Sequence, residues 1–326
     1  MRHRHTRTLR AVLFCLFAPL QLSGRPASAT AQQPGKATAQ PLTLPLGRIH
    51  VLRSQINGQT YDVRVMLPVG YDTLTQRADA MRYPTLYVLD GAWMLFASLT
   101  RGLLSGYPVS PNVIVVGIAS ATDHSQRRGF DYTPLTNDSS RNTARLPDGS
   151  PAHGGADAFL RVLKEEIIPM VDRTYRTTSD RGIHGHSLGG LFVAYAMLEA
   201  PDLFTRYAMT SPSLWWNDRM IITRELEFAK QHPVFPKHVF LSIGSDEDPG
   251  MAAVMYQFAA RLCSSFSKGY YKGLDLIVES IPGEEHQSPV PHWHAMRALY
   301  PADTTGLDRS IPRVPKRPGE LRYCES

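Results

Sequence analysis

The sequence predicts an α/β protein with a mostly parallel, doubly wound sheet that begins with an antiparallel hairpin. Three observations favour this fold class. Two early segments alternate apolar and polar residues, whereas the later strand candidates are continuous apolar runs. Helical segments separate those later runs along the chain. Alternation is typical of strands with one solvated face, and apolar runs interleaved with helices are typical of parallel strands buried on both faces.

The first four strands follow directly from these patterns. They are expected at residues 48–55, 60–67, 83–89 and 113–118. Asn57-Gly58 lies between the first two, and Asn-Gly readily forms the tight turn of a hairpin. Residues 120–151 are polar and contain prolines, so they are predicted as a long loop, which in compact domains is usually functional or mobile.

The second half of the chain alternates helices with strands. Helices are predicted at residues 155–175, 188–198, 217–231, 250–265 and 291–299, and strands directly before Ser187 and at residues 207–210, 238–243 and 274–279. The first of these helices is amphipathic, with Phe159, Leu163 and Ile167 among the apolar residues of one side. No repeat or linker interrupts the order, so one domain is predicted at residues 46–300.

The two ends of the chain differ from the middle. Residues 1–29 combine arginines without acids, an apolar stretch and the small residues Ala27-Ser28-Ala29, which is typical of a secretory signal. An uncleaved anchor is the alternative, although the apolar stretch is short for a membrane span. Residues 30–45 are predicted as a disordered leader and residues 301–326 as an irregular tail. Export to the periplasm or the medium is expected, with no membrane span in the mature chain.

The basic charge of the chain lies largely in this predicted signal. The whole chain has 35 Lys and Arg against 29 Asp and Glu. Residues 1–29 hold five arginines and no acid, so 35 minus 5 leaves 30 basic residues against 29 acidic ones. A nearly neutral mature chain gives no support for nucleic-acid binding.

Two cysteines, Cys263 and Cys324, remain after the predicted signal. An oxidising compartment would allow them to form a disulfide, and two separate buried thiols are the alternative. The sequence does not give the distance between them, so both remain open. The cysteines and histidines do not have the spacing of a zinc site, and neither a metal nor a cofactor is expected.

Residues 185–189, Gly-His-Ser-Leu-Gly, fit the pattern G-x-S-x-G, which marks a sharp turn from a strand to a helix. The flanking glycines prevent the chain from colliding with itself in this turn. The helix that follows directs its amino end at Ser187 and favours negative charge there, and the N–H of Leu188 is a candidate oxyanion donor. Ser187 is therefore a candidate nucleophile, with an incidental serine in a glycine-rich loop as the alternative.

A nucleophilic serine needs a base, and the base needs an acid that orients it. In this architecture the order along the chain is serine, acid, histidine. Three acids, Asp246, Glu247 and Asp248, follow the strand expected at residues 238–243. The residue pattern does not choose among them, and for two of them the alternative is a solvated cluster at a helix start.

His286 follows the last predicted strand, in the loop where the base is needed. His292 and His294 are competitors, but they lie within the next helical stretch. The second oxyanion donor is expected in the loop after the third strand, at Gly91 and Ala92. A simple strand-ending glycine is the alternative for Gly91.

These motifs together resemble the esterase D-like α/β-hydrolases, the family that includes siderophore esterases and feruloyl esterases. The matching pieces are residues 87–91, 131–134, 155–204, 211–216, 244–248 and 283–286. The resemblance covers roughly residues 49–300. It implies the α/β-hydrolase fold, with Ser187 as nucleophile and His286 as base. The family's acid commonly stands three residues after the strand-ending glycine, which is Glu247 here, and Asp246 and Asp248 stay open.

The resemblance also implies that Trp215 and Trp216 lie near the site, although both are equally suited to the core. An anionic ferric siderophore would need a basic pocket, and Arg127 and Arg128 are the nearby candidates. Arg128 is the predicted substrate contact, and two solvated arginines are the alternative. The charge pattern alone does not identify a siderophore as the substrate.

The sequence therefore predicts an exported serine carboxylic ester hydrolase that works through an acyl-enzyme intermediate, without a cofactor, on a small-molecule ester. Siderophore-type or phenolic esters are the first candidate substrates, and cell-wall esters also stay open. An acyltransferase on the same fold and a catalytically silent binding protein are the alternatives. The sequence leaves the oligomeric state open.

Overall fold

The structure, a computed structural model, describes residues 47–68, 71, 81–91, 112–121, 124–138, 142–301 and 320–322. All of these belong to the second of two compact units, residues 45–326. The predicted signal, the predicted leader, Ala92 and Cys324 lie outside the described residues. In the part of the chain that the structure describes, no helix has the length and apolar character needed to span a membrane.

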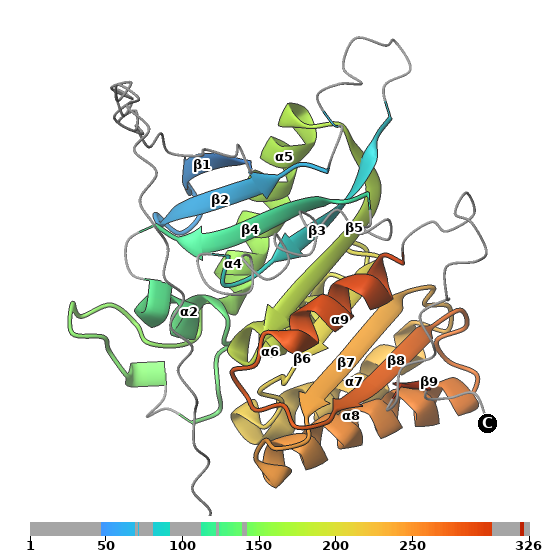
Figure 1. The fold of residues 1–326 in the computed structure, drawn as a ribbon. Coiled ribbons are helices and arrows are strands. Elements are labelled where there is room, and N and C mark those ends of the chain that lie inside the picture. The colour runs from blue at the N-terminus through green and yellow to red at the C-terminus, as the bar shows by residue number, and fades with distance from the viewer. Residues whose placement is uncertain are drawn as a thin grey trace, which may run out of the picture. The chain divides into compact units, whose positions relative to one another are not determined.

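Within the described residues, nine strands form one sheet in the order β1-β2-β4-β3-β5-β6-β7-β8-β9 (Figure 1). The strands are β1 (Arg48–Arg53), β2 (Thr60–Met66), β3 (Tyr83–Val88), β4 (Ile114–Ser120), β5 (Thr177–His186), β6 (Arg206–Thr210), β7 (His238–Gly244), β8 (Asp275–Ile281) and β9 (Glu320–Arg322). From β4 to β8 all neighbours are parallel. The β1–β2 hairpin and the β2–β4 pair are antiparallel.

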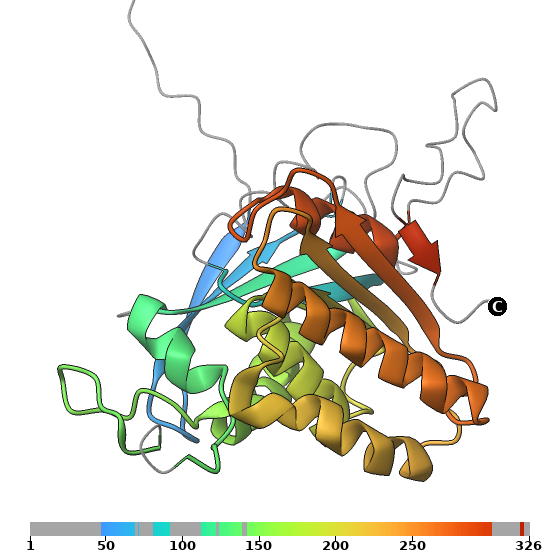
Figure 2. The ribbon, with the colours of Figure 1, turned by 90° about the horizontal axis from the view of Figure 1, so that it is seen from below.

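Helices cover both faces of this sheet (Figures 1 and 2). They are α2 (His124–Asp131), α4 (Ala156–Val162), the π-helical turn η2 (Leu163–Ile167), α5 (Ile168–Thr174), α6 (Leu188–Glu199), α7 (Trp216–Gln231), α8 (Pro249–Ser267) and α9 (Val290–Leu299). Helix α9 packs on β6 and β7 from one face, where Met296 and Leu299 join Ala208 and Phe240 in a small core. The larger core, on the other face, includes residues of α4 to α8. A parallel sheet covered on both faces confirms the predicted fold class.

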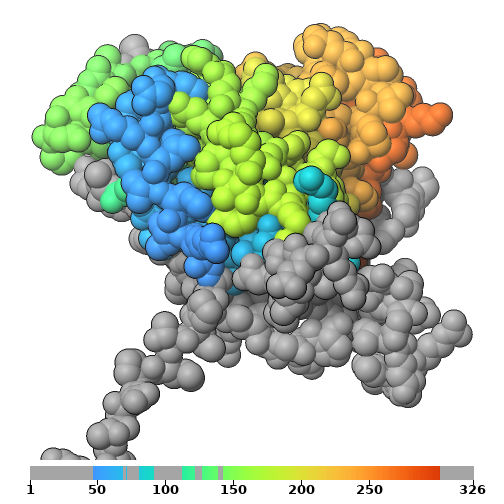
Figure 3. Space-filling model, turned by 90° about the horizontal axis from the view of Figure 1, so that it is seen from above, coloured from blue at the N-terminus to red at the C-terminus, as the bar shows by residue number. Residues whose placement is uncertain are grey.

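Seen from above, the chain order follows the sheet across the molecule (Figure 3). The N-terminal hairpin lies at one side in blue, residues near 150–190 lie in the middle, and the C-terminal half lies at the other side in orange. This arrangement brings the connections after β3, β5, β6, β7 and β8 to the carboxyl edge of neighbouring parallel strands. Functional side chains of open α/β sheets gather at that edge.

The expected helix at residues 155–175 is three consecutive segments, α4, η2 and α5. Pro169 lies in the first turn of α5 and has no N–H to donate to the preceding turn. The wider π-helical turn of η2 directly precedes it. The α-helix is therefore interrupted where Pro169 leaves one α-helical hydrogen bond unmade. π-Helical turns are often found at such interruptions of an α-helix.

Two segments expected to be irregular contain regular structure. Helix α2 forms inside the loop expected at residues 120–151, where Arg127 pairs with Asp131 one turn later. Its eight residues, HSQRRGFD, are mostly polar, so the pattern of apolar residues did not reveal it. The expected irregular tail contains β9, which pairs antiparallel with β8 and places Leu321 opposite Val278. A three-residue edge strand carries too short a pattern to be recognised.

Candidate active site

The turn at Ser187 joins the end of β5 directly to the start of α6. Ser187 has φ 56° and ψ −118°, a backbone conformation that L-residues rarely adopt. A Cβ atom added at Gly185 would lie 2.2 Å from the carbonyl oxygen of Gly189. A Cβ at Gly190 would lie 2.9 Å from the Cα of Pro212. Close backbone approach therefore requires glycine at 185, the first glycine of G-x-S-x-G, and at 190, whereas a Cβ at Gly189 would come no closer than 3.4 Å, to the side-chain Oδ2 of Asp90.

A continuous chain of hydrogen bonds runs from this serine to a glutamate. The Oγ of Ser187 lies 3.1 Å from Nε2 of His286. Nδ1 of the same ring lies 2.7 Å from Oε2 of Glu247. His286 comes from the connection between β8 and α9, and Glu247 from the connection between β7 and α8. The order serine, acid, histidine that the sequence suggested is thus assembled at one edge of the sheet.

Glu247 is the acid that contacts the histidine, and its side chain is only 1% exposed. Its Oε1 accepts hydrogen bonds from the N–H of Gly244 at 2.9 Å and from the hydroxyl of Ser211. Burial raises the pKa of Glu247, but the hydrogen bonds from His286, Ser211 and Gly244 outweigh burial and hold the pKa below the usual value for a glutamate. The carboxylate is therefore kept ionised beside the imidazole.

The two neighbouring acids have other partners. Oδ1 of Asp248 accepts from the N–H groups of Gly250 and Met251 at 2.8 and 3.1 Å and caps α8. Oδ1 of Asp246 accepts from the hydroxyl of Ser245 at 2.8 Å. These are the local roles expected of acids at a helix start.

The competing histidines also lie elsewhere. His292 is buried, and its Nδ1 lies 3.3 Å from Oγ1 of Thr210. His294 pairs through Nδ1 with Oε1 of Glu279 at 2.8 Å. His294 is thus a second histidine with a glutamate partner, located on α9, and it offers a matched control for His286.

The structure corrects one predicted oxyanion donor. The N–H of Gly91 donates to the carbonyl of Ile118, in the neighbouring strand β4, at 2.9 Å. This N–H is therefore already used in a hydrogen bond and is not available to an oxyanion. A Cβ at Gly91 would lie 2.4 Å from the carbonyl carbon of Gly117, so this glycine is required by strand packing. Leu188 is the first residue of α6, where N–H groups have no partner within the helix. Ala92 lies outside the described residues and stays a prediction.

Arg128 pairs with a carboxylate of the loop that follows β3. Its Nε and Nη2 donate to the two carboxylate oxygens of Asp90 at 2.9 and 3.0 Å, and Nη2 lies 3.4 Å from the carbonyl of His186. The adjacent Arg127 pairs with Asp131 at 3.5 Å. Both guanidinium groups thus have carboxylate partners, and a contact of Arg128 with substrate stays a prediction.

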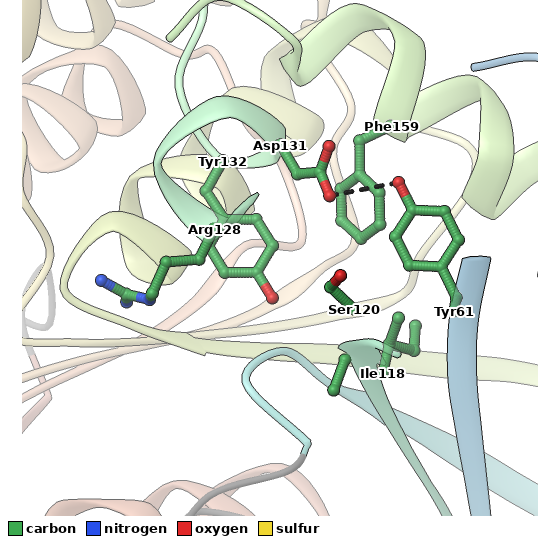
Figure 4. Close-up of a pocket in the computed structure, with 8 residues that line it drawn as sticks. Tyr61, Ile118, Ser120, Arg128, Asp131, Tyr132 and Phe159 are labelled. Atoms are coloured by element: carbon green, nitrogen blue, oxygen red, sulfur yellow. Dashed lines mark hydrogen bonds between the residues drawn. The ribbon is translucent and has the colours of Figure 1, made fainter. Parts of the chain in front are cut away.

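A small cavity of about 10 Å³ lies beside α2 (Figure 4). It is lined by Tyr61, Ile118, Ala119, Ser120, Arg128, Asp131, Tyr132 and Phe159. The hydroxyl of Tyr61 donates to Oδ2 of Asp131 at 3.1 Å across it, and Arg128 points away from this pair (Figure 4). Ser187, His286 and Glu247 are not among the lining residues. The hydrogen-bonded chain, and not this pocket, locates the candidate active site.

The two tryptophans have different environments. Trp216 is 2% exposed, and its Nε1 donates to the carbonyl of Pro134 at 3.2 Å. This burial corrects the prediction of a substrate contact for Trp216, which belongs to the core. Trp215 is 42% exposed, so its predicted contact with substrate stays open. Cys263 is disulfide-bonded, and because Cys324 lies outside the described residues the predicted pairing with Cys324 stays a prediction.

Ser211 and Ser213 are parts of the site that the sequence did not assign. Ser211 bonds Glu247, and Oγ of Ser213 lies 3.4 Å from Oγ of Ser187. Both directly follow β6, at the same edge of the sheet as the other loops. Their position directly after a predicted parallel strand could have identified these two serines from the sequence. In the described residues, no group of three or more His, Cys, Asp or Glu side chains is arranged to hold a metal ion.

The chain is similar in sequence to known esterases. The family model described as putative esterase matches residues 54–268. The ferri-bacillibactin esterase BesA of Bacillus subtilis is 32% identical over 209 residues, which are 61% of this chain and 69% of that protein. The siderophore enterobactin esterase of Emericella nidulans is 36% identical over 181 residues, 50% of this chain and 57% of that protein. The chain thus spans 57% to 69% of the length of these two relatives.

Solved structures share the fold over most of the chain. The BES protein of Bacillus cereus has a TM-score of 0.64 at 24% identity, covering 81% of this chain and 99% of that one. An IroE-like serine hydrolase of Shewanella oneidensis has a TM-score of 0.62 at 27% identity, covering 78% of this chain and 80% of that one. The sheet order, the turn at Ser187 and these likenesses together identify the α/β-hydrolase fold.

Proposed function

Because the chain belongs to the putative esterase family and is a serine ester hydrolase, we propose that Ser187, His286 and Glu247 form its catalytic triad. The observation that carries the proposal is the hydrogen-bonded chain of 3.1 and 2.7 Å through His286. A serine hydroxyl is a poor nucleophile unless a base accepts its proton. In this proposal His286 is the base and Glu247 is the acid that orients it.

The first half of the reaction forms an acyl-enzyme. Ser187 Oγ attacks the ester carbonyl while Nε2 of His286 accepts the hydroxyl proton. The same proton passes to the leaving alcohol as the carbon–oxygen bond to that alcohol breaks. Glu247 keeps the other imidazole proton on Nδ1 and stabilises the imidazolium that forms in between. Water then repeats the steps with His286 as base and releases the free acid.

The oxyanion that forms in each half needs hydrogen-bond donors. Leu188 begins α6, so its N–H adds to the positive end of the helix dipole beside Ser187. We assign the second donor to Ala92, because the N–H of Gly91 is committed to Ile118. Each donor is worth about a hundredfold or more in kcat.

We propose siderophore-type esters as the first substrate class and phenolic esters as the second. BesA and the Emericella nidulans relative are named for siderophore esters, and an endo-1,4-beta-xylanase/feruloyl esterase of Xylanibacter ruminicola is 23% identical over 208 residues. Arg127 and Arg128 are both paired with carboxylates, so these charges do not by themselves favour an anionic ferric complex. Iron-free and ferric forms therefore need separate assays.

The proposed export follows from residues 1–29, which have the composition of a secretory signal. Expression of the full chain in a bacterial host followed by fractionation and intact mass tests it. The expected product lacks residues 1–29 and leaves the cytoplasm. A full-length chain retained in the cytoplasm would contradict the proposal.

The activity is tested with purified protein and a panel of iron-free siderophore, ferric siderophore, methyl ferulate and p-nitrophenyl butyrate. Hydrolysis of at least one ester and labelling of Ser187 by a fluorophosphonate are expected. Methanol added to the assay separates hydrolysis from acyl transfer, because a transferase would form methyl ester in place of free acid. A protein that hydrolyses nothing and does not react with the fluorophosphonate would contradict the proposal.

A further inference from the structure

His186, the residue before the candidate nucleophile, contacts the main chain of the candidate base. Its Nε2 lies 2.7 Å from the backbone carbonyl oxygen of His286. A carbonyl oxygen accepts and does not donate, so the proton of this hydrogen bond belongs to His186. The two imidazole rings also lie together, with centroids 4.7 Å apart. One side chain thus bonds the peptide of the base and packs beside its ring.

The loop that carries His286 needs such an anchor. The His286 side chain is 31% exposed, and the neighbouring residues are held by a few hydrogen bonds to the β7–α8 connection. Gly283 donates through its N–H to Oγ of Ser245 at 2.8 Å, and Glu284 accepts at its carbonyl from the N–H of Asp246 at 3.1 Å. These bonds hold the start of the loop, whereas the bond from His186 holds the peptide of the base itself.

His186 is also firmly placed relative to the nucleophile. It is the last residue of β5, it is covalently joined to Ser187, and its carbonyl lies 3.4 Å from Nη2 of Arg128. Burial, together with the nearby His286, lowers the pKa of His186 to about 4. The ring is therefore neutral at pH 7 and adds no second positive charge when His286 takes a proton.

We propose that the His186 side chain is a positioning residue that fixes the base opposite the nucleophile through its Nε2–H. This inference rests on the proposed function, because it assumes that His286 acts on Ser187. The two reacting atoms lie 3.1 Å apart, and displacements of about 1 Å in such a pair cost about a hundredfold in rate. Losing one anchoring bond, with others kept, is expected to cost about tenfold in kcat.

The test is a matched pair of variants, His186→Gln and His186→Met, in the full mature chain. Glutamine and methionine have nearly the same length and shape, but glutamine retains an N–H at the position of Nε2. His186→Met is expected to lower kcat about tenfold with KM nearly unchanged, and His186→Gln is expected to recover most of the loss. The rate of fluorophosphonate labelling of Ser187 should follow kcat, since it reports the same activation of the serine.

Equal losses in both variants at matched thermal stability would overturn the proposal, because packing and not the N–H would then matter. Unchanged kcat in His186→Met would overturn it as well. If His186→Met does not fold, ¹⁵N-histidine NMR of the wild-type protein decides: a protonated Nε2 on His186 in slow exchange supports the proposal, and a protonated Nδ1 overturns it. A wild type without esterase activity or labelling would instead refute the proposed function.

Discussion

The turn at Ser187 and the loop at His286 hold their residues by different physical means. In the turn, Gly185 and Gly189 approach so closely that a Cβ at Gly185 would lie 2.2 Å from a backbone oxygen. In the loop, a Cβ at Gly283 would meet nothing within 4 Å, although Gly283 has φ 72°. Sterics therefore fix the proposed nucleophile, whereas hydrogen bonds from distant residues fix the proposed base. A short sequence motif reveals the close packing of the turn, but it does not reveal the hydrogen bonds that distant residues make to the loop.

The largest effect should come from neutralising the acid that supports the loop. Glu247→Gln keeps the shape of the side chain but presents an amide to Nδ1 of His286, which favours the wrong tautomer. The kcat of the variant is expected to fall by about 10³- to 10⁴-fold. Asp246→Asn and Asp248→Asn are the matched controls, since those carboxylates bond Ser245 and the start of α8. An equal loss in either control would show that the acid is misassigned.

A methyl group added to each region separates steric from hydrogen-bond control. Gly185→Ala forces an overlap in the turn and should destabilise the protein by about 1–3 kcal/mol and lower kcat by about a hundredfold. Gly283→Ala meets open space and should cost only about 1 kcal/mol for its positive φ. Ester hydrolysis and chemical denaturation measure both. If Gly283→Ala lost more activity than Gly185→Ala, the comparison of the two regions would be wrong.

A smaller effect should come from Ser211, whose hydroxyl bonds the carboxylate of Glu247. Ser211→Ala removes one bond to a charged group and should lower kcat/KM by about tenfold. Ser242→Ala is a suitable control, because Ser242 is also buried and its hydroxyl has no hydrogen-bond partner in the described part of the chain. Equal kcat/KM values for the two variants would remove Ser211 from the site.

The most gradual effect should be a loss of stability in acid. Burial and the nearby His186 lower the pKa of His184 to about 3, and burial and the nearby His286 lower the pKa of His186 to about 4. Burial also lowers the pKa of His292. Between these values and the ordinary value near 6.5, the unfolded chain binds more protons than the folded one.

The unfolding free energy is therefore expected to fall as the pH drops below about 6.5, by about 1 kcal/mol per pH unit for each buried histidine. Urea denaturation between pH 8 and pH 4 measures this slope. His186→Gln should make the slope shallower, because it removes one of these buried histidines. Stability that does not change between pH 7 and pH 5 would contradict the stated pKa shifts.

The sequence predicted what local patterns determine. The continuous apolar run at residues 113–118 largely coincides with β4, in which residues 114–119 are all buried, so the parallel sheet followed from runs of this kind. The glycines around Ser187 identified the turn because close backbone approach leaves few residues that fit. His286 could be selected over His292 and His294 because chain order and position after a strand restrict the base.

What the sequence did not reveal depends on contacts between distant segments. The N–H of Gly91 bonds the carbonyl of Ile118. Trp216 is buried and donates to the carbonyl of Pro134, and neither contact has a local signature in the sequence. Helix α2 carries Arg128, whose partner Asp90 lies 38 positions earlier. Ser211 reaches Glu247 across two neighbouring strand ends. Such pairs are set by the sheet order, which a single sequence constrains only coarsely.

The central claim is most directly tested by the hydrolysis of p-nitrophenyl butyrate by wild type, Ser187→Ala, His286→Ala and His294→Ala. His286 and His294 each bond a glutamate, at 2.7 and 2.8 Å, but only His286 also bonds Ser187. Activity in Ser187→Ala and His286→Ala should fall by at least about a thousandfold, and His294→Ala should stay near wild type. A wild-type rate in His286→Ala, or an equal collapse in His294→Ala, would contradict the account.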